Sequence, residues 1–514
     1  MTAIVLATLN AKYIHASFGL RYLYANLGAL QEKTKLLEFE ISDRSLETAE
    51  EILKYNPKIL GLGVYIWNIA ESIKLIKVLR KVKPELIIVV GGPEVSYEIQ
   101  SQEIYNLVNY VVTGEADLTF PKLCEDLLND IKLESKIIYS PVPEPPAIRL
   151  PYDYYSDSDI KNRIVYVEAS RGCPFTCEFC LSSLEIPVRA FDLDLMLSEF
   201  TKLLSRGVHH FKFVDRTFNL NLKTSKKILE FFLANYKPGL FVHFEMVPDR
   251  LPIQLREIIA KFPAGALQFE VGIQSFNPEV GILISRKQDF DKLAENLIYL
   301  KENTTVHVHA DLIVGLPGET IESFASGFDK LITLGPQEIQ VGILKRLRGT
   351  PIIRHDQAWG MVYSDDAPYE ILKNNQIDYE TMQRMRRFSR YWDLVANSGN
   401  FMEGCKLLWQ NKESSFYEFL KFSDWLYLET NQRFGIALNK LALYLFHYLT
   451  KVALHPELVV AQAISNDFSR LSRKDLPDQI QIILKETKNS SKTVRNTLQF
   501  PLKRQARHLV ASNE

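Results

Sequence analysis

The stretch IVYVEASRGCPFTCEFC, residues 164–180, decides how the central part of this chain folds. It is an apolar strand, Ile164–Ala169, followed at once by Cys173, Cys177 and Cys180 in the spacing C-x3-C-x2-C. Metal ligands on a loop that directly follows a strand are typical of the carboxyl end of a β/α barrel. Thiolates are preferred ligands of iron–sulfur clusters and of zinc. The stretch therefore predicts a barrel with a metal site at its mouth.

The cysteine spacing favours a [4Fe–4S] cluster with one open iron. Such a cluster usually takes four thiolates, but the other two cysteines, Cys124 and Cys405, are distant in the sequence. Three thiolates would leave one iron free to bind a ligand from outside the protein. The alternative is a structural zinc site with a distant fourth ligand such as His209. Zinc motifs usually contain two C-x2-C pairs, and this sequence has only one.

Residues 161–355 alternate apolar strands with helical segments. This alternation is typical of parallel strands joined by helical crossovers. Six such units predict an α/β fold in the form of a partial β/α barrel. The predicted strands are Ile164–Ala169, His210–Val214, Phe241–Met246, Leu267–Ile273, Val306–Ile313 and Ile339–Leu344.

Residues 1–135 show the same alternation and are predicted to form a separate, doubly wound parallel sheet. The ligand site of such a sheet lies at the carboxyl ends of its strands. The strands are expected at Ala3–Thr8, Leu36–Phe39, Ile59–Val64, Leu86–Val90 and Tyr110–Thr113.

Two further regions complete the predicted organisation. Residues 136–160 are predicted to be a linker, because five prolines between positions 141 and 151 exclude a regular helix or central strand. Residues 365–514 are predicted to be a mainly helical domain, whose aromatic segments Phe416–Phe422 and Ile436–Leu449 suit a packed core. Its basic tail is expected to be a solvated surface; its cations are Lys485, Lys488, Lys492, Arg495, Lys503, Arg504 and Arg507.

Composition limits the classes of function. Of the 514 residues 46% are apolar, and the formal net charge is -1, so no global field attracts nucleic acid or membrane. The opening apolar run, Ala3–Leu9, is too short for a signal peptide. No stretch approaches the ~20 apolar residues that a membrane span requires. Because the five cysteines do not form a disulfide framework, we expect a cytoplasmic protein.

Strand alternation predicts a polar barrel lumen. In Val306–Ile313 the apolar residues take the outward positions, which turns His307, His309 and Asp311 inward. An ordinary barrel fills its lumen with Val, Ile and Leu, and buried polar groups are costly unless they are satisfied. They either hydrogen-bond one another or meet a ligand, and we favour a ligand. Among the inward residues we expect catalytic roles for Glu245, Glu270, His307 and His309, beside Tyr166, Glu168, Ser170, His243, Gln268, Gly272, Gln274, Asp311 and Gln340.

The second barrel strand, His210–Val214, gives no clear orientation. Phe211 and Phe213 compete with Lys212 and Val214 for the outward positions. The alternation rule alone does not separate these two arrangements.

The cysteine stretch resembles the signature of the radical S-adenosylmethionine superfamily, C-x3-C-x-Φ-C, with Phe179 as the aromatic residue. The resemblance implies that the open iron chelates the amino and carboxylate groups of S-adenosylmethionine. It also implies reductive cleavage to methionine and a 5′-deoxyadenosyl radical. The electron would come from a donor such as flavodoxin or ferredoxin.

Three other segments are similar to that superfamily. Asp215 and Arg216 end the second strand, where the family contacts the methionine amino group. The segment FEVGIQS, residues 269–275, resembles the fourth-strand segment near the ribose and includes Gln274. The segment LIVGLPGET, residues 312–320, resembles the fifth-strand segment that supports the adenine, with Gly315 and Glu319.

The N-terminal domain resembles that of the cobalamin-binding subfamily. The similar segments are LGLGVYIWN at 60–68, VVGGPEVSYE at 89–98 and TGEAD at 113–117, the last with Glu115. The resemblance implies that Gly91 and Gly92 face the nucleotide tail of cobalamin, although a tight turn after a strand is the plainer alternative.

The loop after the first strand departs from the subfamily. Many cobalamin proteins carry Asp-x-His-x-x-Gly there, with the histidine on cobalt. Here Tyr13 replaces the aspartate that would precede His15, and Gly19 is one place late. A carboxylate normally orients a ligating histidine. We therefore predict that His15 does not bind cobalt and faces the substrate or a cobalamin phosphate instead.

These features favour one activity and leave alternatives open. The leading hypothesis is cobalamin-dependent radical methylation of an unactivated carbon in a small molecule. The alternatives are a radical cyclisation or rearrangement without methylation, an RNA-modifying protein that uses the basic tail, and a non-catalytic sensor. Neutral overall charge and the lack of RNA-module signatures argue against nucleic acid. The helical region after 365 resembles the extra domain of one uncharacterised branch of the subfamily.

Overall fold

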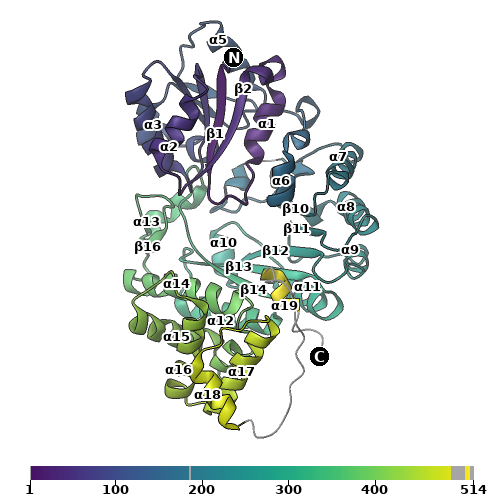
Figure 1. Cartoon of the computed structure of the whole chain (residues 1–514), viewed down its shortest axis with the longest axis vertical. Coiled ribbons are helices and arrows are strands. Elements are labelled where there is room, and N and C mark those ends of the chain that lie inside the picture. The colour runs from purple at the N-terminus through teal and green to yellow at the C-terminus, as the bar shows by residue number, and fades with distance from the viewer. Residues whose placement is uncertain (1, 185–186, 488–503, 510–514) are drawn as a thin grey trace.

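Two six-stranded parallel sheets dominate the structure, a computed structural model that describes residues 2–184, 187–487 and 504–509 (Figure 1). In Figure 1 the sheet of the N-terminal domain lies above that of the central domain, and the C-terminal helices pack below. The predicted α/β class, with a helical C-terminal region, is confirmed. Among the described residues, no helix has the length and apolar character needed to cross a membrane.

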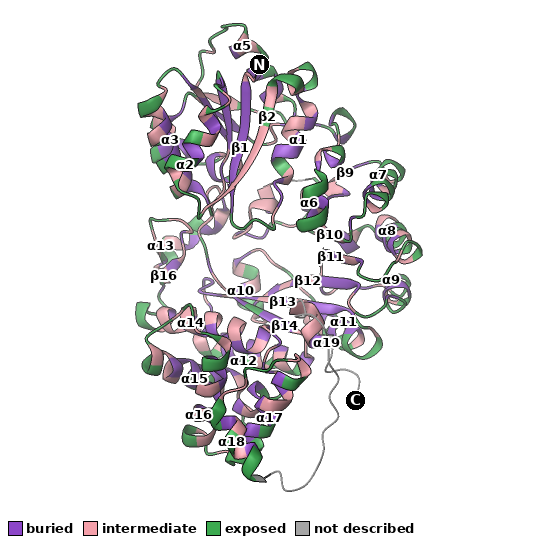
Figure 2. Ribbon diagram, in the orientation of Figure 1, coloured by how far each residue is buried: buried purple, intermediate pink, exposed green. Residues whose placement is uncertain are grey.

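The N-terminal sheet has the strand order β2-β1-β3-β4-β5-β6, with all neighbours parallel. The order reverses between β1 and β3, and ligands bind at the carboxyl side of such a switch point. Figure 2 shows the inner strand β1 buried and the edge strand β2 half-buried. The strands are β1 (Ile4–Asn10), β2 (Thr34–Glu40), β3 (Ile59–Gly63), β4 (Ile87–Gly91), β5 (Tyr110–Thr113) and β6 (Ile137–Tyr139).

Helices cover both faces of this sheet. One face packs against α2 (Ser45–Leu53), α3 (Ile69–Val82) and α4 (Glu103–Leu107), in a core that includes Ile52 and Leu75. The other packs against α1 (Phe18–Asn26) and α5 (Thr119–Leu128). The amphipathic spacing of these helices is what allows each to bury one side on the sheet.

Part of the predicted linker is regular structure. The strand β6, Ile137–Tyr139, pairs in parallel with β5 and extends the N-terminal sheet. The helix α6, Asp157–Asn162, is capped by Ser156, whose hydroxyl accepts from the Asp159 N–H in a capping box. The prediction missed both elements because β6 is short and the prolines beyond it dominate the local composition.

The central sheet is an open, partial barrel, as predicted. Its strand order is β14-β13-β12-β11-β10-β7, all parallel, with β14 and β7 at the two edges. The strands are β7 (Val165–Val167), β10 (His210–Phe213), β11 (Phe241–Met246), β12 (Leu267–Gln274), β13 (His307–Val314) and β14 (Glu338–Ile343). The surrounding helices are α7 (Leu193–Ser205), α8 (Leu222–Ala234), α9 (Ile253–Ile259), α10 (Pro278–Leu283), α11 (Phe290–Asn303) and α12 (Ile321–Leu334).

Sequence alternation sets which side of each barrel strand is apolar. On β13 the outward residues Val308, Ala310 and Leu312 are at most 3% exposed. On β10 Phe211 and Phe213 are fully buried. Lys212 instead reaches Glu270 across the lumen at 3.6 Å, which resolves the strand that gave no clear orientation.

The C-terminal region is a helical layer built on aromatic side chains. Phe328 of α12 packs edge to face on Trp392 of α14, with ring centroids 4.8 Å apart. The aromatic residues of α15, such as Phe416 and Phe419, join the same core, as expected. One short hairpin, β15 with β16, precedes these helices. The elements are β15 (Val362–Tyr363), β16 (Ile371–Lys373), α14 (Tyr379–Trp392), α15 (Ser415–Thr430), α16 (Leu438–His447), α17 (Glu457–Arg470), α18 (Asp478–Thr487) and α19 (Arg504–Leu509).

Candidate functional site

The cysteine loop lines a cavity at the mouth of the partial barrel. Cys173 and Cys177 are buried and Cys180 is half-buried. Together with Phe179 they line a cavity of about 180 Å³ that also contains side chains from β11, β12 and β13. The predicted loop therefore stands where the carboxyl ends of the barrel strands converge.

The loop suits a multi-iron cluster better than a single metal ion. Among the described residues, no group of three or more His, Cys, Asp and Glu side chains converges on one ion. The thiolates of an iron–sulfur cluster bind separate iron atoms, so they need no common point. Arg286 Nη1 donates to Cys177 Sγ at 3.2 Å. The alternative zinc ligand His209 is exposed and precedes β10, at the opposite end of the barrel.

Several of the predicted lumen residues meet at this cavity. Glu245, Glu270, Gln274, Asp311 and Arg216 all line it. Arg216 Nη1 donates to Glu245 Oε1 at 2.8 Å. The Glu270 carboxylate lies 3.0 Å from Nε2 of His243.

The carboxyl groups of the cavity have pKa values shifted in different directions. Burial opposes ionisation of Glu270, but the His243 hydrogen bond and the Lys212 charge lower its pKa to about 2. Burial raises the pKa of Glu245, although Arg216 opposes the shift. Burial and the nearby charges of Glu270 and Glu245 hold the pKa of Asp311 well above its usual range. The cavity thus pairs an ionised carboxylate with a carboxyl group that tends to keep its proton.

Asp311 also has an unsatisfied oxygen at the cavity wall. Its Oδ1 is buried without a hydrogen-bond partner among the described residues, and His309 Nε2 lies 3.6 Å away. An unsatisfied buried oxygen costs about 1–3 kcal/mol unless a ligand completes it. This position therefore fits the polar ligand that the sequence predicts.

His307 does not belong to the cavity. It is 3% exposed at the start of β13, and its Nε2 lies 3.0 Å from Glu338 Oε1. Arg504 of α19 pairs with the same carboxylate at 2.7 Å, and the His508 ring lies 5.2 Å from the His307 ring. The expected catalytic placement of His307 is therefore not what the structure shows. It belongs to a network with Glu338 at the amino ends of the strands, in which His307 Nδ1 has no hydrogen-bond partner among the described residues.

The described part of the basic tail closes the amino end of the barrel. In Figure 1 the helix α19, in yellow, lies beside β14. Gln505 Nε2 donates to Gln268 Oε1 at 3.0 Å, and Arg504 also pairs with Asp393. Arg504 is therefore bound within the chain rather than solvated as expected, whereas Lys485 of α18 is exposed as expected. Lys488, Lys492, Arg495 and Lys503 lie outside the described residues.

Three residues expected to help bind S-adenosylmethionine, Asp215, Gly315 and Glu319, do not line the cavity that holds the cysteines. The Asp215 carboxylate accepts from Ala169 N at 2.9 Å and from Ser170 Oγ at 2.6 Å, so it fixes the chain that leads into the cysteine loop. Gly315 has φ +91°, and a Cβ there would lie 2.7 Å from Ile371 of the C-terminal region. Glu319 is buried and accepts from Ser323 Oγ at the start of α12.

A second cavity, of about 460 Å³, lies at the carboxyl edge of the N-terminal sheet. Five glycines are among the residues that line its sheet side; they are Gly61, Gly63, Gly91, Gly92 and Gly114. A Cβ on Gly92 would lie 2.4 Å from the carbonyl oxygen of Val64, and one on Gly61 would lie 2.7 Å from the Phe120 ring, so the packing of the chain itself requires glycine at both positions. The cavity lies beside the switch point, where a doubly wound sheet binds its ligands.

Glu115 lines this second cavity, but its charge is already paired. Arg171, which directly precedes the cysteine loop, lies 2.8 Å from Glu115 and 3.0 Å from Asp117. Arg189 pairs with Glu115 as well. The TGEAD segment therefore joins the N-terminal domain to the barrel.

His15 lines neither of these two cavities. Its Nδ1 lies 2.7 Å from the hydroxyl oxygen of Tyr166, a lumen residue of β7. Its backbone forms a parallel bridge with Ile164. Burial lowers the pKa of His15, assisted by the charges of Lys212 and Lys12. The loop is thus tied to the first barrel strand.

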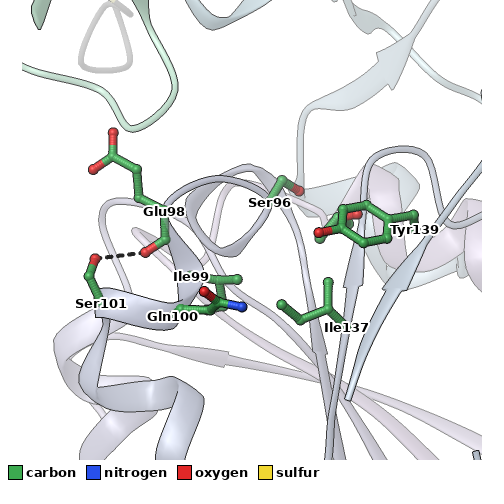
Figure 3. Close-up of a pocket in the computed structure, with 8 residues that line it drawn as sticks. Ser96, Glu98, Ile99, Gln100, Ser101, Ile137 and Tyr139 are labelled. Carbon is green, nitrogen blue, oxygen red and sulfur yellow. Dashed lines mark hydrogen bonds between the residues drawn. The ribbon is translucent and has the colours of Figure 1, made fainter. Parts of the chain in front are cut away.

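The two cavities share a wall. Ser182 and Arg216 line both of them. A third pocket, of about 490 Å³, lies at the outer edge of the N-terminal sheet (Figure 3). Its lining includes Ser96, Gln100 and Tyr139 but none of the predicted site residues. The chemistry that the sequence predicts is therefore concentrated in the two adjoining cavities.

Sequence reasoning missed charged residues of the cavity: Arg286 lines it, and Lys212 pairs with Glu270 on its wall. Lys212 was obscured by the two phenylalanines around it on β10. Arg286 follows α10 in a loop, where strand alternation gives no information. Its guanidinium reaches Cys177 and the Gly272 carbonyl oxygen. Only the folded chain brings this cation to the cysteines.

Comparison with known families identifies the domains. Residues 167–331 match the radical SAM superfamily, in which SAM denotes S-adenosylmethionine, and residues 4–124 match the B12 binding domain. Residues 357–509 match a family described as protein of unknown function (DUF4080). The chain thus carries a B12-binding domain ahead of a radical SAM domain, which confirms the predicted cofactor domains.

Two of the curated relatives that the chain matches are named as methyltransferases. The chain is 25% identical over 334 residues to "Uncharacterized methyltransferase PH0819" of Pyrococcus horikoshii, covering 59% of this chain and 70% of that protein. It is 24% identical over 347 residues to "Cobalamin-dependent radical SAM methyltransferase TokK" of Streptomyces tokunonensis, covering 58% and 48%. The match therefore spans about half the length of the second relative.

Solved structures share the fold. The "Cobalamin-dependent S-adenosylmethionine radical enzyme OxsB" superposes with a TM-score of 0.60 at 14% identity, covering 94% of this chain and 78% of that chain. The radical S-adenosylmethionine methyltransferase TsrM from Kitasatospora setae superposes with a TM-score of 0.57 at 16% identity, covering 71% and 77%. At these identities the likeness describes architecture.

Proposed function

We propose that this chain, with its radical SAM domain behind a B12-binding domain, is a cobalamin-dependent methyltransferase that acts on an unactivated carbon of a small molecule. The observation that carries the proposal is the shared wall of the two cavities. One cavity holds the three cysteines and the other lies at the glycine-rich edge of the N-terminal sheet, and Ser182 and Arg216 line both. Two cofactors held there would face a common space.

The residues present suit these cofactors. Cys173, Cys177 and Cys180 would hold a [4Fe–4S] cluster, and the glycine edge would accept cobalamin. When bound, one S-adenosylmethionine at the cluster would supply the radical, a second would supply the methyl group, and cobalamin would carry that methyl group. Gln274 and Phe179 stand beside the cysteines in the same cavity.

The charged residues of the cavity suit ligands that carry both a carboxylate and an ammonium or hydroxyl group. Arg216 and Arg286 present cations that suit a carboxylate, and ionised Glu270 suits an ammonium or hydroxyl group. Asp311, with its raised pKa, can donate a hydrogen bond as a neutral acid. These groups would orient S-adenosylmethionine and a polar substrate within reach of each other.

We propose further that the chain works in the cytoplasm with an electron donor such as flavodoxin or ferredoxin. All five cysteines are free thiols, and a cluster on three of them needs a reducing compartment. The donor would supply the electron that reductive cleavage consumes.

The decisive experiment uses methyl-labelled S-adenosylmethionine. Protein purified anaerobically should first be examined for the small molecules it retains, because these are the natural candidates for substrate. With a retained compound and a strong reductant, label should appear on substrate carbon. Each turnover should yield one 5′-deoxyadenosine and one S-adenosylhomocysteine.

The products also decide against the proposal if it is wrong. Deoxyadenosine formed with substrate, but without S-adenosylhomocysteine or label transfer, would exclude methylation. A radical cyclisation or rearrangement would then be the better account of the same two cavities.

A further inference from the structure

A segment that follows β14, residues 346–355, contacts the surroundings of both cavities, and we call it the strap. Near its beginning Gly349 N donates to Glu98 Oε1 at 3.2 Å. Near its end Ile352 N donates to the Glu178 carbonyl oxygen at 3.0 Å. Glu98 belongs to the N-terminal domain, and Glu178 lies within the cysteine loop.

The first end of the strap is anchored on the loop that follows β4. Arg348 Nε lies 3.0 Å from Glu94 Oε1, and the Glu94 side chain is only 4% exposed. Arg346 pairs with Glu98 at 3.3 Å. Figure 3 shows the Glu98 side chain pointing up toward the pale green ribbon. The loop therefore offers two carboxylates to two arginines of the strap.

This anchor adjoins the glycine-lined cavity. Glu94 and Glu98 flank Ser96 and Tyr97, which line that cavity with Gly92. The strap packs so closely on this loop that a Cβ on Gly349 would lie 2.3 Å from the Tyr97 ring. A movement of the loop that carries Tyr97 would therefore displace the strap.

The second end is anchored inside the cysteine motif. Glu178 stands between Cys177 and Cys180, and its side chain is 2% exposed. Its Oε2 accepts from His355 Nε2 at 2.8 Å, and Arg354 pairs with its Oε1. Ser285 Oγ donates to the same Oε1 at 2.6 Å. A buried carboxylate is costly without such partners, so these contacts fix the position of the loop.

We propose that the strap couples the two cofactor sites, with Arg348 and His355 as positioning residues at its two ends. A ligand in the glycine-lined cavity fixes the position of the loop after β4. The strap, which contacts both loops, then fixes the position of the cysteine loop. Binding free energies are reciprocal, so a bound cluster must in turn strengthen cobalamin binding. The inference rests on the proposed function, because it takes the two cavities to hold these two cofactors.

The test measures each cofactor with and without the other. In wild-type protein, bound cobalamin should slow the loss of iron to a chelator. A reconstituted cluster should lower the dissociation constant of cobalamin by roughly tenfold, within the usual range of coupling between sites. Neither measurement requires turnover or the substrate.

The coupling factor is the dissociation constant of cobalamin without the cluster divided by that with the cluster. The variants Arg348→Met and His355→Gln should bring this factor toward one. Arg348→Met leaves the Glu94 carboxylate without its arginine partner. The double variant Glu94→Gln/Arg348→Met therefore also removes the negative charge of Glu94. The matched control is Arg384→Met, which breaks the 2.7 Å pair with Asp424 among the C-terminal helices. This control should keep the wild-type coupling.

The outcomes separate the two proposals. Wild-type protein that binds both cofactors independently would overturn the strap and leave the proposed function standing. Coupling that survives unchanged in folded double-variant protein would overturn the strap as well. Failure of wild-type protein to bind cobalamin or a cluster would overturn the proposed function, and the strap with it.

Discussion

The Arg216 guanidinium and the Glu245 carboxylate pair at 2.8 Å on the wall between the two cavities. The Arg216 side chain is half exposed, so the pair adds less than about 1 kcal/mol to stability. We expect Arg216→Met to keep the melting temperature and bound iron while lowering turnover at least ~10-fold. Turnover and thermal denaturation measured on the same preparation check this. A large melting loss with unchanged turnover would assign Arg216 to the fold instead.

The cysteine loop gives the plainest prediction. Replacing Cys173, Cys177 and Cys180 by alanine should abolish bound iron and S-adenosylmethionine cleavage, whereas Cys124→Ala and Cys405→Ala should keep both. The two control thiols are buried in other elements, where burial raises each pKa to about 12. Metal analysis of anaerobic protein checks this, and stoichiometric zinc in place of iron would contradict it.

The contact between His15 and Tyr166 supports a prediction about cobalt. Because His15 does not line the glycine-lined cavity and its loop is tied to the first barrel strand, we expect the lower axial position of cobalamin not to be filled by His15. The electron paramagnetic resonance spectrum of the Co(II) form should therefore be the same in wild type and His15→Ala. Nitrogen superhyperfine splitting that vanishes in the variant would refute this.

The lumen should divide into a ligand layer and a structural layer. Asp311→Asn should lose most S-adenosylmethionine cleavage with little change in melting temperature, because Asp311 Oδ1 has no partner within the described residues. His307→Ala should remove the hydrogen bond to the buried Oε1 of Glu338 and cost about 1–3 kcal/mol of stability, while cleavage persists. Both variants need the same two assays. The reverse pattern would restore His307 as a catalytic residue.

Glu338 makes the stability of the barrel depend on pH. Burial opposes its ionisation, but the His307 hydrogen bond and the Arg504 charge lower its pKa to about 2. A lowered carboxyl pKa stabilises the fold above the unfolded pKa of about 4.5, and this contribution fades as the pH falls toward 2. Stability should therefore fall by up to roughly 3 kcal/mol across this window.

The variant Glu338→Gln should show a flatter acid profile than wild type between pH ~4.5 and ~2. Asp157→Asn, at a fully exposed carboxylate, is the matched control and should follow the wild-type profile. Denaturation of cofactor-free protein at each pH provides the measurement. Parallel wild-type and Glu338→Gln profiles would mean that the unfolding of the barrel is not linked to this proton.

The periodic elements of both sheets could be predicted from the sequence. Strand alternation and helical spacing can be recognised within short stretches of sequence, because each strand or helix buries one apolar face against its neighbours. The predicted strand Phe241–Met246 agrees with β11 at both ends. The strand β6 was missed, since three residues beside a proline-rich segment carry too little pattern. Spacing within eight residues likewise placed the three cysteines in one cavity.

The partners of the charged side chains were decided only by the tertiary structure. Asp215 was expected at the methionine amino group, but it holds the backbone before the cysteine loop. Glu178 meets His355 across 177 residues of chain, and Arg348 meets Glu94 across 254. Local sequence fixes which face of an element is apolar. A buried charge instead takes the counter-charge that folding brings near it, and that neighbour can come from any part of the chain.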